Sequence, residues 1–344
     1  DDSNPTLEPI QATVEVGMGT DKSIEEYFTF AKTGRGASTL SCKEGNTQIT
    51  NVSTLALGDH VVKCIATKTS NGKTSAEKQV TIKVVGASNS KVLANGANQT
   101  WTTSWQSSDA SGLYAQTVGS NKTYYYKGAV ENNYVKFADK VWRIVRINED
   151  GTIRLITQDS VASQKFNSTS TTYNEMYYTN SEIKTAVENW YKTNITDKGF
   201  DGKVASGNYF CEQAKVVWST SYTAGNATVA TKDNYTPSFD CTTDGNGKGV
   251  VRGKVGLITI DEVLFAGGVI GSSPNFYLKN GSTYWMMSPA GFDYINAIAW
   301  SVDSVGNTNF NFVNSTLGVR PVLNLSADTL VSGSGTSSDP YIVK

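Results

Sequence analysis

The sequence predicts a mostly β protein with minor α content, arranged in two domains. Its 344 residues exceed what a single hydrophobic core usually organises, so two domains are expected. Asn, Thr, Ser, Gly and Tyr are abundant, and that mixture favours strands and turns over long helices. All seven tryptophans lie after residue 100, which indicates that the second core differs in make-up from the first.

The first predicted domain, residues 1–86, is a series of short strands separated by turns. We expect strands at residues 12–16, 27–31, 37–42, 59–68 and 75–85. The last two alternate apolar and polar residues, which is the period of a half-buried strand. Asn71-Gly72 lies between them and is a strong hairpin signal. Paired strands in a segment of about 85 residues suit a small β-sandwich.

A family resemblance in this domain is carried by GDHVVKCIAT at residues 58–67 and SNG at residues 70–72. With the strand that follows, these segments resemble the hyalin-repeat (HYR) and related bacterial immunoglobulin-like modules. The resemblance implies an immunoglobulin-like β-sandwich with a disulfide across it, a spacer or adhesion role, and no catalysis. Lys68 departs from the aspartate usual in the family, and the immunoglobulin core tryptophan is missing.

Residues 87–100 are predicted to be a linker, because they are small and polar and show no periodicity. The second domain then covers residues 101–344. It is predicted to open with a β-meander, whose strands lie at residues 124–128, 132–137, 141–147 and 152–156. Asp150-Gly151 is predicted to form a type I′-like hairpin turn between the last two strands.

Two short helices are predicted in the second domain. Ser181 caps the first, in which apolar residues recur at three- and four-residue spacing until Asn194 ends it. Thr259 caps the second, which covers residues 261–266 before two glycines. Residues 196–253, between the helices, are loop-rich. Strands are expected again at residues 284–288, 297–302, 309–313 and 318–325.

A second resemblance spans nearly all of residues 112–344. Its segments are similar to an uncharacterised domain common in surface and secreted proteins of Gram-positive gut bacteria: NNYVKF (132–137), WRIVRI (142–147), NWY (189–191), KVGLIT (254–259), DEV (261–263), YWMMSP (284–289), GVRPVLNL (318–325), GSGT (333–336) and DPY (339–341). The Trp-Ser-Pro segment, a variable stretch and the Val-Arg-Pro strand also resemble the C-type-lectin-like fold. That resemblance implies an α+β domain whose variable loops, within residues 290–317, meet ligands.

The four cysteines fall as two separated pairs, one in each predicted domain. Three connectivities are possible, and pairing within each domain is the simplest. We therefore expect the disulfides Cys42–Cys64 and Cys211–Cys241. Such bonds persist outside the reducing cytosol, so an extracellular or cell-surface location is predicted. The alternative is four reduced, buried thiols.

Charge and hydropathy exclude several partners. Thirty basic and 31 acidic residues nearly cancel and form no long run, so neither nucleic acid nor an anionic membrane surface is expected as a partner. No stretch reaches the roughly 18 apolar residues of a membrane span, and no signal peptide opens the chain. We expect no membrane insertion, and a signal segment to have been removed.

The sequence contains few residue arrangements that could support catalysis. His60 is the only histidine, so neither a Ser-His-Asp nor a Cys-His arrangement is available. No catalytic residue, cofactor or metal is predicted. Two hypotheses stay open: a hydrolase built on two carboxylates, and Ca²⁺ binding by residues 240–249, which otherwise form a solvated turn. The carboxylates considered for hydrolysis are Asp233, Glu262, Asp293 and Asp303.

Aromatic and amide side chains suit the recognition of glycans or proteins. Trp142, Trp190 and Trp285 lie in patterned segments and are expected in the core. The predicted ligand-binding residues lie in the variable loops and are Phe292, Asp293, Tyr294, Asn307, Asn309 and Asn311. The sequence thus predicts an extracellular adhesion or ligand-binding protein, whose partner is a glycan or a host or bacterial surface protein. The alternatives are a carboxylate-dependent glycan hydrolase and a purely structural surface or pilus component.

Overall fold

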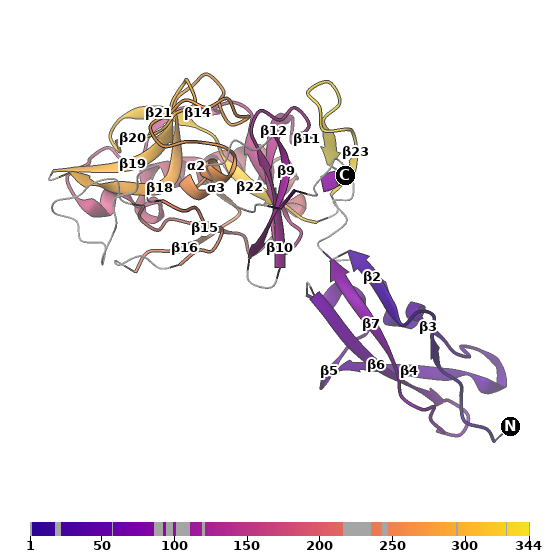
Figure 1. The fold of residues 1–344 in the computed structure, drawn as a ribbon. Helices are drawn as coiled ribbons and strands as arrows, with labels where there is room; N and C mark the ends of the chain where they lie inside the picture. Colours follow the sequence, from indigo (N-terminus) through magenta and orange to yellow (C-terminus); the bar gives the residue numbers. More distant parts are fainter. Residues whose placement is uncertain are drawn as a thin grey trace. The chain divides into compact units, whose positions relative to one another are not determined.

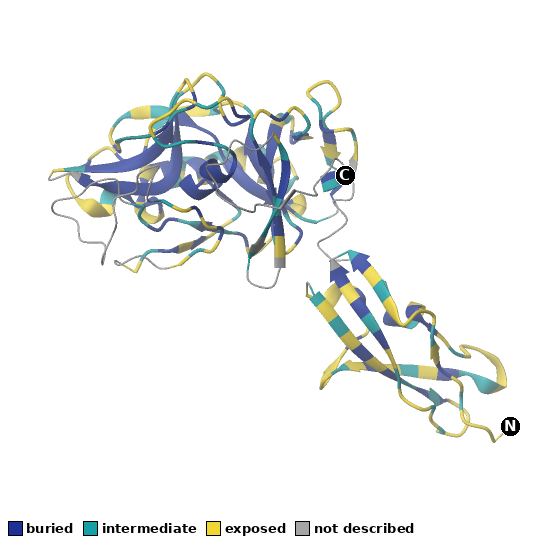
Figure 2. Cartoon of the chain, in the orientation of Figure 1, coloured by how far each residue is buried: buried dark blue, intermediate teal, exposed yellow. Residues whose placement is uncertain are grey.

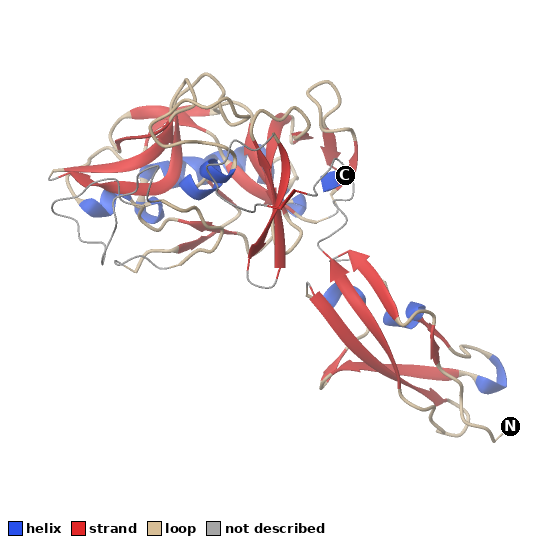
Figure 3. Cartoon of the chain, in the orientation of Figure 1, coloured by secondary structure: helices blue, strands red, loops and turns tan. Residues whose placement is uncertain are grey.

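A computed structural model describes most of the chain. The described residues are 2–17, 22–56, 58–85, 92–93, 99–100, 111–118, 121–215, 235–242, 247–293, 295–327 and 329–343. Strands make up 42% and helices 15%, so the prediction of a mostly β protein is confirmed (Figure 3). The chain forms two compact units, one containing Asp1–Ser90 and the other containing Lys91–Asn148 and Thr152–Lys344.

The first unit is built on one five-stranded sheet. Its strands follow the order β2 (Thr13–Gly17), β7 (Lys78–Val85), β6 (Gly58–Lys68), β4 (Ser38–Glu44) and β5 (Thr47–Gln48) (Figure 1). β2 is parallel to β7, and the other neighbours are antiparallel. A separate pair joins β1 (Glu8–Pro9) to β3 (Phe28–Thr29). β3 is shorter than predicted, because Ile24–Tyr27 forms a 3₁₀ turn capped by Ser23.

Strand β6 shows why this sequence forms a sheet. Val62, Cys64 and Ala66 are fully buried, while the residues between them face outward, as the alternation predicts (Figure 2). The turn after β6 agrees with its sequence too. Gly72 has a φ of 74°, a left-handed value that glycine adopts without a steric penalty. The Asn71 side chain accepts a hydrogen bond from the backbone N–H of Lys73.

The second unit contains two larger sheets. The ten-stranded sheet runs β17 (Val255–Gly256), β22 (Val322–Leu325), β13 (Ile153–Thr157), β12 (Lys140–Ile147), β10 (Asn121–Lys127), β9 (Gly112–Val118) and β8 (Gln99–Thr100), with β11 (Tyr134–Phe137), β23 (Leu330–Ser332) and β24 (Tyr341–Val343) beside it. The five-stranded sheet runs β14 (Ala162–Lys165), β21 (Thr316–Val319), β18 (Tyr284–Asp293), β19 (Asn296–Val302) and β20 (Thr308–Phe312). A short pair joins β15 (Tyr209–Cys211) to β16 (Val250–Arg252).

Helices α2 and α3 accompany these sheets in the described part of the chain, and both predicted caps are confirmed. Ser181 caps α2 (Glu182–Tyr191), and Thr259 caps α3 (Ile260–Phe265) in a capping box with Glu262. α3 packs against β10 of one sheet and β18 of the other (Figure 1). The predicted end of the first helix at Asn194 is wrong, because a π-helical turn, Lys192–Thr196, continues it.

The hairpin predicted at Asp150-Gly151 joins β12 to β13, but its predicted turn type is wrong. A type I′ turn needs positive φ at both central residues, and at Asp150-Gly151 only Gly151 has it. Ala138 and Asp139, between β11 and β12, have φ values of 49° and 59°. The tightest turn of the meander therefore lies one hairpin earlier than predicted.

The core of the second unit includes Val92, which is fully buried and belongs to the stretch predicted as a linker. Residues 87–91 and 94–98 of that stretch lie outside the described residues. Trp142 and Trp285 are fully buried, which confirms their predicted core positions, while Trp190 is only partly buried. β18 extends five residues beyond its predicted end at Ser288, so the predicted loops after it are shorter.

Candidate functional site

The structure divides the predicted ligand-binding residues. Phe292 lies in β18, is only 8% exposed and belongs to the hydrophobic core, so its expected place in a loop is wrong. Asp293 also lies in β18, but its side chain is outside the described part of the chain, and Tyr294 lies outside the described residues altogether.

The three predicted asparagines lie on and beside edge strand β20. Asn311 pairs with Ala299 and Asn309 with Ser301, whereas Asn307 precedes the strand. Phe292 pairs with Ala297, at the opposite end of β19 from Asn307, so at about 3.3 Å per residue the two positions are roughly 20 Å apart. The predicted set therefore does not form one site.

The amides of β20 are engaged locally. Asn311 Nδ2 donates to Ser301 Oγ at 2.8 Å, and Asn309 Oδ1 accepts from the Phe310 backbone N–H at 2.9 Å. Asn307 Oδ1 is buried and has no hydrogen-bond partner among the described residues. A role of these three asparagines in ligand binding therefore stays a prediction.

The carboxylates considered for hydrolysis do not meet in an open cleft in the described part of the chain. Asp303 Oδ1 accepts from the backbone N–H groups of Val305 and Asn307 at 3.0 and 2.8 Å, which builds a local turn. Glu262 is buried with two arginines. Asp233 lies outside the described residues.

Glu262 occupies a buried ionic cluster. Arg146 and Arg154 are directly opposite each other on β12 and β13, and the carboxylate Oε1 lies 3.6 and 2.5 Å from their Nε atoms. The guanidinium groups lie over the Phe239 and Phe210 rings, each 4.4 Å from the centroid. The cavity beside them measures about 10 Å³, too small for a substrate. This cluster is therefore part of the core.

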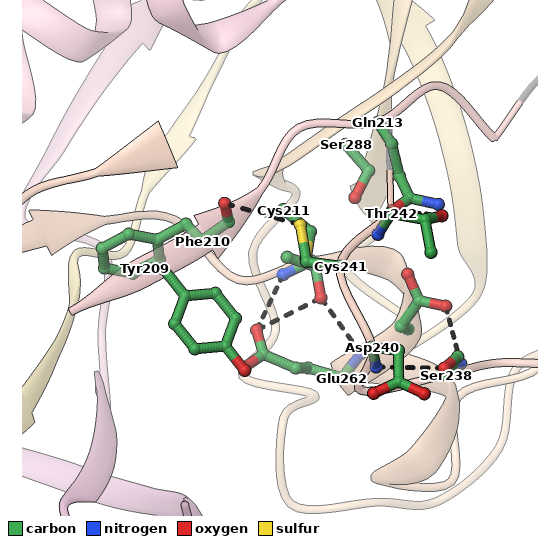
Figure 4. Close-up of a disulfide and its surroundings, with 12 residues drawn as sticks. Tyr209, Phe210, Cys211, Gln213, Ser238, Asp240, Cys241, Thr242, Glu262 and Ser288 are labelled. Atoms are coloured by element: carbon green, nitrogen blue, oxygen red, sulfur yellow. Dashed lines mark hydrogen bonds between the residues drawn. A yellow bond between two sulfur atoms is a disulfide. The ribbon is translucent and has the colours of Figure 1, made fainter. Parts of the chain in front are cut away.

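Both predicted disulfides, Cys42–Cys64 and Cys211–Cys241, are present. Cys42 and Cys64 are paired residues of adjacent strands in one sheet, so the disulfide expected across a sandwich is wrong in that respect. Cys241 instead tethers the segment 235–242 beside the start of α3 (Figure 4). Asp261 accepts there from the Tyr235 hydroxyl at 2.5 Å and from the Ser238 N–H at 3.0 Å. Burial first, and then the Asp261 charge, raises the pKa of Tyr235.

An open groove of about 460 Å³ lies elsewhere on the second unit, and we name it the Trp190 groove. Its volume falls in the range of small-molecule sites. Three segments far apart in the sequence line it: the start of β12, the end of β13 with the loop after it, and the end of α2 with the turn that follows. The lining residues are Lys140, Val141, Thr157, Asp159, Ser160, Val161, Trp190 and Asn194.

Trp190 is held firmly in this groove. Its ring meets the buried Trp142 ring edge-on at 6.1 Å, and Lys140 Nζ lies 5.7 Å from its centroid. Asn194 Nδ2 donates to the Trp190 carbonyl at 2.9 Å, which ties the π-helical turn back to α2. Because Trp190 is only partly buried, part of a fixed aromatic surface stays open.

Buried Arg320 holds the backbone of Thr157, another residue that lines the groove. Arg320 Nε donates to the Thr157 carbonyl at 2.8 Å, and Nη1 donates to the Leu278 carbonyl at 2.7 Å. Burial lowers the pKa of Arg320, while Tyr284 and then Asp159 oppose that shift. Asp159 itself is exposed. The hydroxyls Thr157 Oγ1 and Ser160 Oγ are buried without hydrogen-bond partners among the described residues.

The sequence does not indicate this groove, because Trp190 has the spacing of a core residue on α2. That spacing correctly indicates its contact with Trp142 but not its exposed edge. Lys140 and Asp159 belong to no motif, and Asn194 was expected only as the end of a helix. Their proximity arises only when β12, β13 and α2 pack together.

A wider concavity of about 910 Å³ lies on the first unit, over the outward face of β4 and β6. Its charged residues Lys43, Glu44, Asp59, Lys63 and Glu77 have mixed signs, and Lys63 pairs with Glu77 at 3.1 Å. Val61 lies among them and is largely exposed. This surface is an ordinary solvated sheet face.

No model of a known protein family matches the chain, and no curated protein is significantly similar to it in sequence. Across the described residues, no three or more His, Cys, Asp or Glu side chains gather as metal ligands would. Asp244, considered for Ca²⁺, lies outside those residues. In the same part of the chain, no helix has both the length and the apolar character needed to cross a membrane.

Proposed function

We propose that this is an extracellular or cell-surface binding protein, in which the second unit recognises the ligand and the first serves as a spacer. The observation that carries the proposal is the Trp190 groove, where a fixed aromatic ring and polar side chains line one open cavity. Small-molecule sites combine apolar surface with a few placed polar groups in this way. The two disulfides suggest an oxidising environment and so support a location outside the cytosol.

Family-level proposals accompany this function. The five-stranded sheet, with the separate β1–β3 pair, supports an HYR-like immunoglobulin module for the first unit, although its disulfide joins neighbouring strands of one sheet. Two short helices packed with extensive sheet support a C-type-lectin-like fold for the second. Neither fold by itself specifies a ligand, so the function is argued from the groove.

A steric block tests the site. Val141 is 46% exposed in the groove, so Val141→Arg places a long side chain there with little effect on the core. Val250 is similarly exposed on β16 and lies outside the groove, so Val250→Arg is the matched control. The full chain is applied to an array of glycans and host surface proteins. We expect saturable binding that Val141→Arg abolishes and Val250→Arg retains.

Three results would count against the proposal. Binding that survives Val141→Arg moves the site elsewhere, and Asn309→Ala then tests the predicted contacts on β20. Cleavage of a bound glycan, detected by mass spectrometry after incubation with the chain, would indicate an enzyme. If neither a glycan nor a surface protein binds saturably, a purely structural component is favoured.

A further inference from the structure

We infer that the Trp190 groove binds a neutral, pyranose-containing glycan, with the Trp190 ring as the stacking surface. This inference rests on the proposed function and adds the class of ligand. A pyranose presents a flat face of C–H groups surrounded by hydroxyls. It is therefore matched by an open aromatic ring with hydrogen-bonding groups beside it, which is the arrangement of this groove.

The rigidity of Trp190 favours this use. The edge-on contact with Trp142 and the Asn194 hydrogen bond to its carbonyl fix the ring and its backbone before any ligand arrives. A side chain that is already ordered loses little conformational entropy on binding. Trp190 is thus a preorganised surface rather than an aromatic residue left at the protein surface by chance.

The polar groups of the groove complement hydroxyls. The Asp159 carboxylate is exposed and acts only as an acceptor, while Lys140 supplies donors. Asn194 uses Nδ2 on the Trp190 carbonyl, and no hydrogen bond to its Oδ1 is recorded in the described part of the chain. Sugar hydroxyls both donate and accept, so they fit this mixed set.

Charge decides between a neutral and an anionic ligand. Among the groove residues, Lys140 carries a positive charge and Asp159 a negative one, so the lining is neutral overall. Asp159 opposes the approach of a phosphate or carboxylate, and buried Arg320, which donates to two carbonyls, does not line the groove. A neutral sugar meets no such repulsion.

The wall of the groove is shaped around two hydroxyls. Gly318 lies against Ser160, and a Cβ at that position would come within 2.3 Å of Ser160 Oγ. Buried hydroxyls without partners are costly, and a χ1 rotation of Thr157 or Ser160 toward the groove would let a ligand hydroxyl satisfy one. These two unpartnered hydroxyls support a polyhydroxylated ligand.

The test uses the full chain on an array of neutral and acidic oligosaccharides that covers the common hexoses, N-acetylhexosamines and uronic acids. We expect neutral glycans to bind and acidic ones not to. Trp190→Ala and Asp159→Ala should each weaken binding about tenfold or more, which corresponds to about 1.4 kcal/mol. Trp190→Phe keeps a ring and should lose less. Glu188→Ala, on an exposed position of the same helix, should bind as the parent does.

Trp190→Ala removes a contact with Trp142, so thermal melting accompanies each variant. Asp159→Ala alters an exposed side chain and keeps the test valid if Trp190→Ala does not fold. Binding only to acidic glycans, or neutral binding unchanged in both variants, would overturn the inference. Groove-dependent binding to a protein and to no glycan would also overturn it, yet would leave the proposed binding function standing.

Discussion

The cores of the two units differ in what they bury. In the first unit, strands β6 and β7 place small aliphatic residues inward and polar residues outward, and Cys42–Cys64 lies within that layer. In the second, fully buried tryptophans share the interior with arginines, including Arg143 and Arg320. The first core is specified by a period of two residues. The second depends on partners that come from distant segments.

The buried arginines of the second unit show how those partners are supplied. Arg143 donates to the Asn133 side chain and the Val130 carbonyl, each at 2.6 Å, and lies 3.8 Å from the Tyr134 ring centroid. Its partners are neutral acceptors and aromatic faces, as are those of Arg320. Among the buried arginines of the described residues, Arg146 and Arg154 differ in sharing one carboxylate. The second unit should therefore be far more sensitive to single substitutions inside its core.

The largest effect is expected at Trp285. Its ring is fully buried against Phe166, and its Nε1 donates to the Gln164 carbonyl at 2.9 Å. Trp285→Ala should lower the free energy of unfolding by about 3–5 kcal/mol through the cavity it leaves. Denaturant unfolding followed by the remaining tryptophans measures this. Phe312→Ala, at a largely exposed position, is the control and should cost under about 1 kcal/mol. Equal losses would contradict the assigned core.

The second largest effect is expected for Glu262→Gln, which should lower the free energy of unfolding by about 3 kcal/mol. The substitution leaves two buried guanidinium groups without their shared counter-charge. The same measurement applies. Glu188→Gln breaks an exposed i,i+4 pair with Lys184 and should change stability by less than about 0.5 kcal/mol. If the two variants unfold alike, the Arg146–Glu262–Arg154 cluster does not stabilise the core.

The sequence predicts features that depend on neighbouring residues better than contacts between distant segments. Alternation located β6 and β7, and the cap signals located α2 and α3 at Ser181 and Thr259. Thr259 and Glu262 are three residues apart, so their capping box is a local pattern. The contact of Glu262 with Arg146 and Arg154 is not a local pattern, because it forms only when β12, β13 and α3 pack together. Phe292 was misplaced for a related reason, because β18 continues past Pro289.

The first unit should depend more on its disulfide. Small cores rarely supply much stability alone, and replacing Cys42 and Cys64 together by Ala should cost about 2–4 kcal/mol. All tryptophans lie in the rest of the chain, so tryptophan fluorescence is silent for this unit. We expect the double variant to shift a transition seen by far-ultraviolet circular dichroism while the fluorescence transition stays in place. A shift of the fluorescence transition instead would show that the two units do not unfold separately.

The smallest effect concerns Asp201, at the surface of the second unit. It accepts hydrogen bonds from Lys254 Nζ and from the Tyr191 hydroxyl, and these, the Lys254 bond first, hold the pKa of Asp201 below its ordinary value. A lowered carboxyl pKa adds stability above the unfolded-state value of about 3.9, and that stability is lost as the pH falls through the lower, folded-state value. Asp201→Asn should therefore lower the melting temperature by roughly 1–3 °C at pH 7, and by progressively less as the pH falls from 4 toward 2.

Asp197→Asn is the matched control for this pH dependence. Asp197 pairs with Lys192 at 2.8 Å in an exposed position, and no hydrogen bond from a tyrosine to Asp197 is recorded in the described residues. It should change the melting temperature less than Asp201→Asn at pH 7, because its ion pair is exposed to solvent. If the difference between Asp201→Asn and the parent were as large at pH 2 as at pH 7, the effect would come from packing of the Tyr191 hydroxyl rather than from charge. The Asp201 site would then resemble the sites of Arg143 and Arg320 in the core, which neutral acceptors rather than carboxylates hydrogen-bond.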